Sequence, residues 1–296
     1  MSTLNLYAIT TLIWGSTWLA IKFQLGGVPP AVSVAWRFAL AAFILLVYAK
    51  WQKLPLRFSP RNHLWMAVQG LFMFGPSYVC VYLAEQYLAS GLVAVAFSLM
   101  VFWNIIGMRL FFSAPVNPKT LLAAIIGVAG VSLVFWPQLE SISTSGDTAI
   151  GLAFAVIGTI AASLGNMTAM RNQAHQIPIV PLNGWAMMYG AIFVGTYAAL
   201  SGLEFAFDWS LGYLASLGYL ALFGSVLAFG SYLTLLKRIG ADRAGYIGVA
   251  IPVVALLLST LFEDLRWQPS MVIGIVLCVG GNVLILRGAE RRTQGS

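Results

Sequence analysis

The feature that most constrains this chain is a series of apolar stretches, each about twenty residues long. An α-helix rises about 1.5 Å per residue, so each stretch is long enough to cross a hydrocarbon layer about 30 Å thick. Short polar or Gly/Pro-containing segments separate the stretches. We therefore expect ten membrane-spanning helices, at residues 4–21, 30–48, 63–83, 88–111, 118–135, 149–170, 179–200, 211–235, 244–262 and 269–286.

The composition supports this interpretation. Hydrophobic residues make up 60% of the 296-residue chain and charged residues only 8%, whereas about 25% of the residues are charged in an ordinary soluble domain. Even the longest connections, residues 50–62 and 136–148, are too short to fold as a separate domain. The sequence therefore predicts an all-α membrane protein whose activity lies within the bilayer, and it excludes a water-soluble fold.

The basic residues lie mostly on one of the two sides that the spans define. A net charge of +7 would suggest a nucleic-acid partner in a soluble chain, but in a membrane protein basic loops mark the cytoplasmic side. Of the 16 Lys and Arg residues, Lys22 and Arg266 fall on the other side and Arg37 falls within the second span. We expect both termini in the cytoplasm, a location in the inner (plasma) membrane, contact with lipid, and no nucleic-acid partner. The thirteen residues on the cytoplasmic side are Lys50, Lys53, Arg57, Arg61, Arg109, Lys119, Arg171, Lys237, Arg238, Arg243, Arg287, Arg291 and Arg292.

A weak internal repeat divides the spans into two sets of five. An offset of 149 matches Pro29 with Pro178, Trp36 with Trp185, Phe74 with Phe223 and Gly75 with Gly224. Because five is odd, the second set enters the membrane from the opposite face. We expect two inverted five-helix repeats, at residues 1–140 and 141–288, with a cytoplasmic tail at 289–296. In the later part of each repeat an offset of 151 matches Leu110 with Leu261, Phe111 with Phe262, Pro118 with Pro269, Val128 with Val279, Gly130 with Gly281 and Leu133 with Leu284.

Inverted repeats are a recurring architecture of secondary transporters, in which the substrate binds near the midplane and the halves exchange two conformations. The repeat therefore favours a carrier that works by alternating access. The alternative is that duplication merely built a larger helical bundle, as in some channels and membrane enzymes.

Several motifs resemble those of EamA-type members of the drug/metabolite transporter superfamily. The first half carries IWGSTWLAIK at residues 13–22, PP at 29–30 and WRFALA at 36–41, and the second half carries LKRIGAD at 236–242, IPVVA at 251–255 and LFE at 261–263. Two positions of the first half depart from the family pattern, where Val101 replaces a proline and Phe112 an acidic residue. The resemblance implies ten helices, cytoplasmic termini and export of small metabolites. Within the family the chain resembles the YddG-like amino-acid exporters.

Aromatic and amide side chains deep within the spans are the candidate substrate-binding residues. Trp14 and Trp18 share one face of the first span, and Tyr78 and Tyr82 repeat this spacing in the third. Lipid offers no partner to an indole N–H or a phenol O–H, so these rings should face the bundle interior or a wet cavity, although interhelical packing is the alternative for each of them. The full predicted set is Trp14, Thr17, Trp18, Tyr78, Tyr82, Trp103, Asn104, Asn166 and Tyr246.

Two prolines and one arginine inside the spans carry further expectations. Pro76 and Pro252 each remove a backbone hydrogen bond, which predicts hinges, with an ordinary static bend as the alternative. Arg37 costs about 2.5 to 3.5 kcal/mol on insertion scales unless it is paired or wetted. It either binds a substrate carboxylate or satisfies loop carbonyls and acidic partners near the outer surface, and the second, structural role is favoured.

No acidic residue lies in the middle of a predicted span. Glu85 and Glu263 lie at the outer ends of spans. Carboxylate-coupled proton antiport is therefore not expected, and we predict facilitated movement of substrate through an uncharged, aromatic-lined central cavity. Cys80 and Cys278 lie in apolar spans without a nearby His, so neither a metal nor another cofactor is expected, and no catalytic constellation predicts an enzyme. The predicted function is export of small metabolites, above all amino acids, by a monomer. Efflux of lipophilic or quaternary cations is the alternative within this class, and a channel or an intramembrane enzyme is the alternative outside it.

Overall fold

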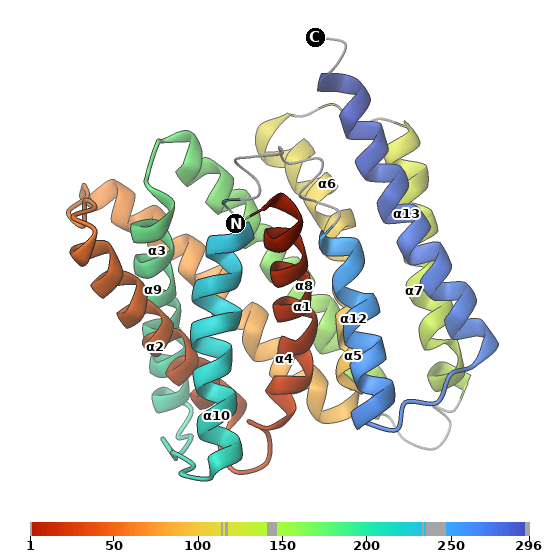
Figure 1. Ribbon diagram of the computed structural model, residues 1–296, viewed down its shortest axis with the longest axis horizontal. Coiled ribbons are helices and arrows are strands. Elements are labelled where there is room, and N and C mark those ends of the chain that lie inside the picture. The colour runs from red at the N-terminus through yellow and green to blue at the C-terminus, as the bar shows by residue number, and fades with distance from the viewer. Residues whose placement is uncertain are drawn as a thin grey trace. The chain divides into compact units, whose positions relative to one another are not determined.

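The computed structural model describes residues 2–113, 115, 118–140, 147–232, 234 and 247–293. In this part of the chain all regular structure is helical, as Figure 1 shows, which confirms the all-α prediction. The helices are α1 (Thr3–Lys22), α2 (Pro30–Trp51), α3 (Pro60–Phe74), α4 (Pro76–Tyr87), α5 (Ser90–Phe97), α6 (Met100–Phe112), α7 (Pro118–Glu140), α8 (Asp147–Ala174), α9 (Ile179–Leu200), α10 (Leu211–Tyr219), the π-helix η2 (Leu220–Leu227), α12 (Ile247–Phe262) and α13 (Pro269–Thr293).

Among the described residues, seven helical stretches are long and apolar enough to cross a membrane. They are Thr3–Lys22, Pro30–Trp51, Pro60–Tyr87, Ser90–Phe112, Asp147–Ala174, Ile179–Leu200 and Leu211–Tyr232. Three shorter apolar helices, Leu121–Trp136, Ala250–Phe262 and Pro269–Gly281, overlap the three remaining predicted spans. The chain is thus an integral membrane protein, as its composition predicts.

Local sequence explains where several helices begin. Proline is the first residue of α2, α3, α4, α7 and α13, a position at which its missing N–H costs no helical hydrogen bond. Ser59 caps α3 by accepting a hydrogen bond from the backbone N–H of Asn62, and Ser210 caps α10 by accepting one from Tyr213. These caps satisfy backbone donors that the first helical turn leaves without partners.

Three of the predicted spans are not uniform α-helices. The third is broken at Gly75, between α3 and α4, and the fourth is interrupted between α5 and α6 at Ser98 and Leu99. The eighth changes from α10 into the π-helix η2. Sequence periodicity predicts none of the exact positions of these irregularities, because apolar residues populate every face of these spans.

The chain divides into two compact units. Unit 1 contains the described residues of Met1–Leu19, Ala84–Val156 and Ala228–Ser296, and unit 2 contains Ala20–Leu83 and Ile157–Leu227. Each unit therefore combines helices from the first and the second half of the sequence. Within unit 1, α1 begins and α13 ends on the same side of the view in Figure 1.

In unit 1, α7 and α13 lie side by side and run in opposite directions (Figure 1). A Cβ atom added to Gly130 would lie 2.6 Å from the carbonyl oxygen of Gly274, and one added to Gly281 would lie 2.6 Å from that of Ala123. By the repeat offset of 151, Gly130 is equivalent to Gly281, and Ala123 is equivalent to Gly274. The contact between Gly130 and Gly274 is therefore equivalent to the contact between Gly281 and Ala123, as expected for two equivalent helices related by a two-fold axis.

Cys278 and Gly127 lie on this same seam and are separated by that same offset. The Cys278 thiol donates to the carbonyl oxygen of Gly127, with a distance of 3.5 Å from Sγ to oxygen. Two equivalent residues can touch only near the axis that relates them. The buried, small Cys278 is thus a packing residue of the α7–α13 pair.

Unit 2 contains a second antiparallel pair, α2 and α9. A Cβ atom added to Gly184, near the start of α9, would lie 2.9 Å from Cδ2 of Leu46, near the end of α2. One added to Gly195, near the end of α9, would lie 3.9 Å from Cβ of Ala35, near the start of α2. By the repeat offset of 149, Ala35 is equivalent to Gly184, and Leu46 is equivalent to Gly195. These two contacts are therefore also equivalent to each other.

Candidate functional site

In unit 2, the buried Arg37 of α2 lies against two aromatic rings. Its side chain is 2% exposed, and its Cζ lies 4.8 Å from the ring centroid of Tyr78 and 5.3 Å from that of Phe38. The rings of Phe38 and Tyr78 meet edge to face, with centroids 4.7 Å apart. Cation–π contacts of this kind are strongest where water is excluded.

The Arg37 guanidinium is incompletely satisfied in the described part of the chain. Its Nε donates to the hydroxyl of Ser225 at 3.4 Å, a length near the outer limit for such bonds. Its buried Nη1 has no hydrogen-bond partner among the described residues. The structural alternative for this residue named loop carbonyls and acidic groups as its partners, whereas its contacts among the described residues are a hydroxyl and two rings.

Ser225 is positioned by the π-helix. Its hydroxyl donates to the carbonyl oxygen of Leu220 at 3.0 Å, five residues earlier, where the wider turn of η2 leaves room for this bond. Short π-helical segments occur frequently at functional sites. The Ser225 oxygen is thereby fixed beside Arg37, which comes from a helix 188 residues earlier in the chain.

Tyr82 lies one turn after Tyr78 in α4. It is fully buried, and its hydroxyl donates to Oε1 of Gln24 at 2.8 Å. Gln24 lies in the loop after α1 and is 1% exposed. The Tyr82 hydroxyl is therefore engaged in fastening this loop to α4.

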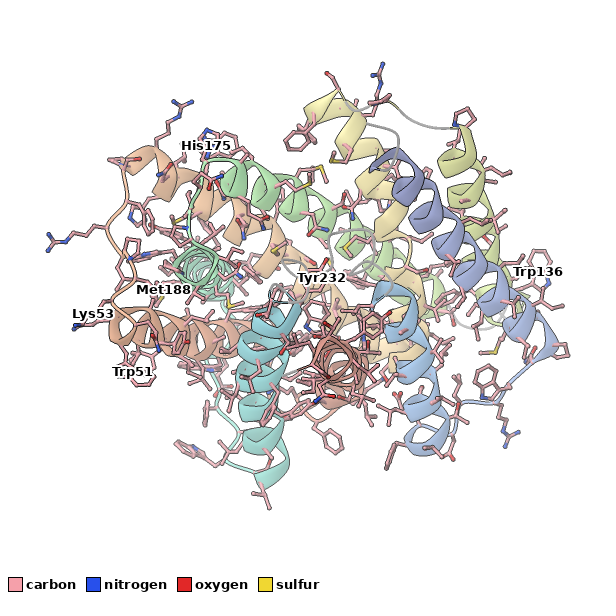
Figure 2. All side chains as sticks on the ribbon, turned by 45° about the horizontal axis from the view of Figure 1, so that its top comes forward. Trp51, Lys53, Trp136, His175, Met188 and Tyr232 are labelled. Carbon is pink, nitrogen blue, oxygen red and sulfur yellow. The ribbon has the colours of Figure 1, made fainter. Side chains whose placement is uncertain are left out.

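In unit 1, α1 contributes the predicted tryptophans. Trp14 lies with its ring centroid 5.2 Å from that of Phe229 and 5.3 Å from that of Tyr232, which is labelled in Figure 2. Trp18, one turn further on, meets Phe97 edge to face at 5.1 Å. These pairs form an aromatic surface along one side of α1.

Neighbouring residues in α1 fix this surface. The Thr17 hydroxyl donates to the carbonyl oxygen of Trp14 at 2.7 Å, so Thr17 has its hydroxyl turned onto the helix backbone. Gly15 lets α1 approach α12, because a Cβ atom at this position would lie 2.5 Å from Cγ1 of Val254. The helix that carries the two tryptophans thereby packs closely against a second helix of unit 1.

The two acidic residues at the outer ends of spans have different surroundings. Glu263 follows α12, and its carboxylate accepts hydrogen bonds from the backbone N–H and the hydroxyl of Ser90 at the start of α5. Glu85 lies in the last turn of α4 as expected, yet its side chain is only 1% exposed. A carboxylate is therefore enclosed by protein near the end of this span.

The model of one protein family matches both halves of the chain. It is the EamA-like transporter family, and the matched residues are 2–136 and 149–287. The chain belongs to the EamA-like transporter family. The resemblance in the sequence motifs is thus confirmed, and the EamA-family chain is a membrane transporter.

Similar proteins in three bacteria agree with this assignment. The chain is 24% identical over 277 residues to Protein PagO of Salmonella typhimurium, covering 93% of this chain and 90% of that protein. It is 22% identical over 275 residues to the uncharacterized transporter YoaV of Bacillus subtilis, covering 91% and 92%. It is also 22% identical over 315 residues to a probable amino-acid metabolite efflux pump of Escherichia coli (strain K12), covering 97% of each chain.

A solved crystal structure shares the fold of this EamA-family chain. The two agree with a TM-score of 0.70 and 17% sequence identity, over 98% of each chain. At this identity the likeness extends to the fold alone.

The remaining predicted site residues of the EamA-family chain lie in both units. Trp103 and Asn104 are partly buried in α6 of unit 1, and Asn166 is partly buried in the portion of α8 that belongs to unit 2. The buried Nε1 of Trp103 has no hydrogen-bond partner among the described residues. Tyr246 lies outside the described residues. The structure brings Trp14, Thr17 and Trp18 together on α1, and brings Arg37 to Tyr78.

The two prolines occupy different positions. Pro76 is the first residue of α4, directly after the break at Gly75. Pro252 is buried inside the continuous helix α12. Movement at either residue stays a prediction.

Sequence reasoning missed several partners of the predicted residues. Gln24, Phe229 and Ser225 are examples, and each contacts a residue distant in sequence. Only the Gly-Ser pair at 224–225, a small-residue site in an apolar span, hinted at the special character of η2. In the described residues, no group of three or more His, Cys, Asp and Glu residues could hold a metal ion.

Proposed function

We propose that this EamA-family chain exports small metabolites, above all amino acids, across the inner membrane by alternating access. The observation that carries the proposal is that equivalent residues of the two sequence repeats make equivalent contacts. In unit 1 Gly130 contacts Gly274, and their counterparts in the other repeat, Gly281 and Ala123, also contact each other. The α2–α9 pair of unit 2 follows the same rule. Equivalent antiparallel helix pairs are what ten spans arranged as two inverted five-helix repeats require.

The division of the sequence into halves is supported by the two ranges that the family model matches, 2–136 and 149–287. They lie within the proposed repeats at residues 1–140 and 141–288, which precede the tail at 289–296. Each compact unit draws helices from both repeats. A rearrangement of the units would then move both repeats in equivalent ways, as alternating access requires.

The residues that we propose to contact the substrate are mainly aromatic. They are Trp14, Thr17, Trp18, Trp103 and Asn104 in unit 1, Tyr78, Tyr82 and Asn166 in unit 2, and Tyr246, which lies outside the described residues. Rings provide apolar contact for a substrate side chain, and a cation–π interaction with the substrate ammonium contributes about 0.5 to 2 kcal/mol. The name of the E. coli relative, a probable amino-acid metabolite efflux pump, supports amino acids as the substrate class.

We propose facilitated export that is not coupled to a mid-membrane carboxylate. Glu85 is buried, but it lies in the last turn of α4, far from the midplane of a span. Two ends of unit 1 support the proposed orientation, because α1 begins and α13 ends on one side (Figure 1). We propose that this side faces the cytoplasm, as the distribution of basic residues along the sequence predicts, and that the carrier is a monomer.

The test uses purified protein in proteoliposomes preloaded with unlabelled amino acid, with a panel of radiolabelled amino acids outside. We expect saturable uptake that is accelerated by the unlabelled amino acid inside and does not require a pH gradient. Protein-free liposomes are the control. Absence of uptake for every amino acid in the panel, together with saturable uptake of tetraphenylphosphonium, would overturn the proposal in favour of cation efflux. Flux that does not saturate would indicate a channel.

A further inference from the structure

We propose that Arg37 binds the carboxylate group of the transported amino acid. This inference rests on the proposed function and assigns one chemical group of the substrate to one residue. It departs from the structural role that sequence reasoning favours for Arg37. The reason is the set of contacts that the structure gives this guanidinium.

The charge of the buried Arg37 side chain calls for an anionic partner. Removing a lone guanidinium from water is unfavourable unless an anion compensates it. The described residues provide no carboxylate contact to Arg37. A substrate carboxylate would provide the missing negative charge and accept hydrogen bonds in the bidentate geometry that a guanidinium prefers.

The Arg37 guanidinium also has a buried donor without a partner among the described residues. A purely structural arginine, as deeply buried as this one, would be expected to use its donors on carbonyl groups or acids. Instead Nη1 is buried without a partner among the described residues, and Nε makes one long bond to Ser225. Nη1 is therefore available to an incoming acceptor.

Irregular helical elements lie near Arg37. Tyr78, whose ring covers the guanidinium, is the third residue of α4 after the break at Gly75. Ser225 lies within the π-helix η2. The break at Gly75 and the π-helix η2 both interrupt regular α-helix near Arg37, and such places absorb local rearrangement at lower cost than a continuous helix does. A rearrangement of either one would open the guanidinium to the substrate.

The site also matches an amino acid in its apolar part. Phe38 and Tyr78 flank the guanidinium with ring faces and edges. A carboxylate bound to Arg37 would bring the rest of an amino acid against these rings. Substrates without a carboxylate would leave the charge uncompensated.

The first experiment compares ligands on the wild-type protein. Uptake of radiolabelled phenylalanine into preloaded proteoliposomes is inhibited with unlabelled phenylalanine, phenylalaninamide or phenethylamine. We expect phenylalanine to inhibit at least about tenfold more strongly than either compound without a carboxylate, the size of one charge-assisted interaction. Equal inhibition by all three would overturn the role of Arg37. Absence of uptake of any amino acid would instead overturn the proposed function itself.

The second experiment compares Arg37→Gln with Arg37→Lys and with a matched control, Arg171→Gln. Arg171 also lies over an aromatic ring, 4.3 Å from that of Trp65, at the end of α8. We expect Arg37→Gln to raise KM for phenylalanine at least about tenfold, and Arg37→Lys to raise it less, because lysine keeps the charge but loses the planar fork. Arg171→Gln should leave KM unchanged.

A structural role predicts a different result. Arg37→Gln would then lower the thermal unfolding temperature of the ligand-free protein without changing the selectivity for phenylalanine over phenethylamine. A stability measurement separates the two roles, because phenylalanine should raise the unfolding temperature of wild type and of Arg171→Gln but not that of Arg37→Gln. If Arg37→Gln does not fold, the same comparison with Arg37→Lys decides. An unchanged KM and an unchanged ligand-induced shift in Arg37→Lys, together with equal inhibition by the three wild-type ligands, would overturn the proposal.

Discussion

The backbone N–H of Ser90 donates to the carboxylate of Glu263. The Ser90 nitrogen lies 3.1 Å from each carboxylate oxygen. The Ser90 hydroxyl donates to the same carboxylate. Ser90 is the first residue of α5, and Glu263 directly follows α12. An acidic group thus satisfies the free N–H at the positive end of a helix dipole, and it ties the start of α5 to the end of α12.

Glu263→Gln removes this charge and is expected to lower the free energy of unfolding by about 0.5 to 2 kcal/mol, as the loss of a helix cap does. The thermal unfolding temperature of the purified protein in detergent measures the change. Asp264→Asn is the control, because Asp264 is exposed and asparagine tolerates its positive φ of 52°. Equal unfolding temperatures for both variants would contradict the proposed cap.

Gly130→Ala is expected to destabilise the protein, because the added Cβ atom would lie 2.6 Å from backbone atoms of α13. Overpacking of this kind costs about 1 to 3 kcal/mol. Gly127→Ala is a matched control one turn away, since a Cβ atom there would meet nothing within 4 Å. Unfolding in detergent should therefore occur at a lower temperature for Gly130→Ala alone. A similar loss in both variants would mean that helix propensity or another general effect governs this seam.

Tyr82→Phe is expected to lower stability by about 1 kcal/mol or more, because it leaves the buried Oε1 of Gln24 without its donor. Tyr197→Phe, at a side chain that is 58% exposed, should have little effect. Chemical or thermal unfolding of the two variants gives the comparison. If Tyr82→Phe unfolds like wild type, the contact between α4 and the loop after α1 contributes nothing to stability.

Trp14→Ala is expected to reduce amino-acid uptake in proteoliposomes at least about tenfold, since it removes the ring that contacts Phe229 and Tyr232 from the proposed binding surface. Trp51→Ala removes a ring that is 75% exposed at the end of α2, labelled in Figure 2, and should preserve uptake. The folded fraction of each variant, measured by size-exclusion chromatography, is the control. Normal uptake by folded Trp14→Ala would remove Trp14 from the binding surface.

The sequence was sufficient to predict an all-helical membrane protein, and seven of the ten predicted spans overlap described helices that are long and apolar enough to cross a membrane, because this property depends on length and apolar character alone. It also indicated the irregular third span, since Gly75 and Pro76 together interrupt helical hydrogen bonding at the observed break. The π-helix was not predictable in the same way. Leu220–Leu227 has no proline and one glycine, and its wider turn depends on a local backbone arrangement that no residue in it requires.

The sequence predicts the residue types of the candidate site but not the partners that these residues have in the structure. Deep aromatic residues such as Trp14 and Tyr78 follow from the need of polar rings to avoid lipid. The burial of Glu85 did not follow from its place near a helix end, because burial depends on the neighbouring helices. The partner of Tyr82 was likewise undetermined, since Gln24 lies in a connecting loop.

By itself, the sequence determined that this chain is helical, lies in a membrane and contains an internal repeat. Apolar length and periodic identity are local properties, and they can be read along one chain. The tertiary structure alone decided that Arg37 lies beside Ser225, 188 residues away, with one buried nitrogen lacking a partner in the described residues. Which side chains meet depends on how the helices turn and pack against one another, and in an almost uniformly apolar chain no sequence pattern encodes that rotation.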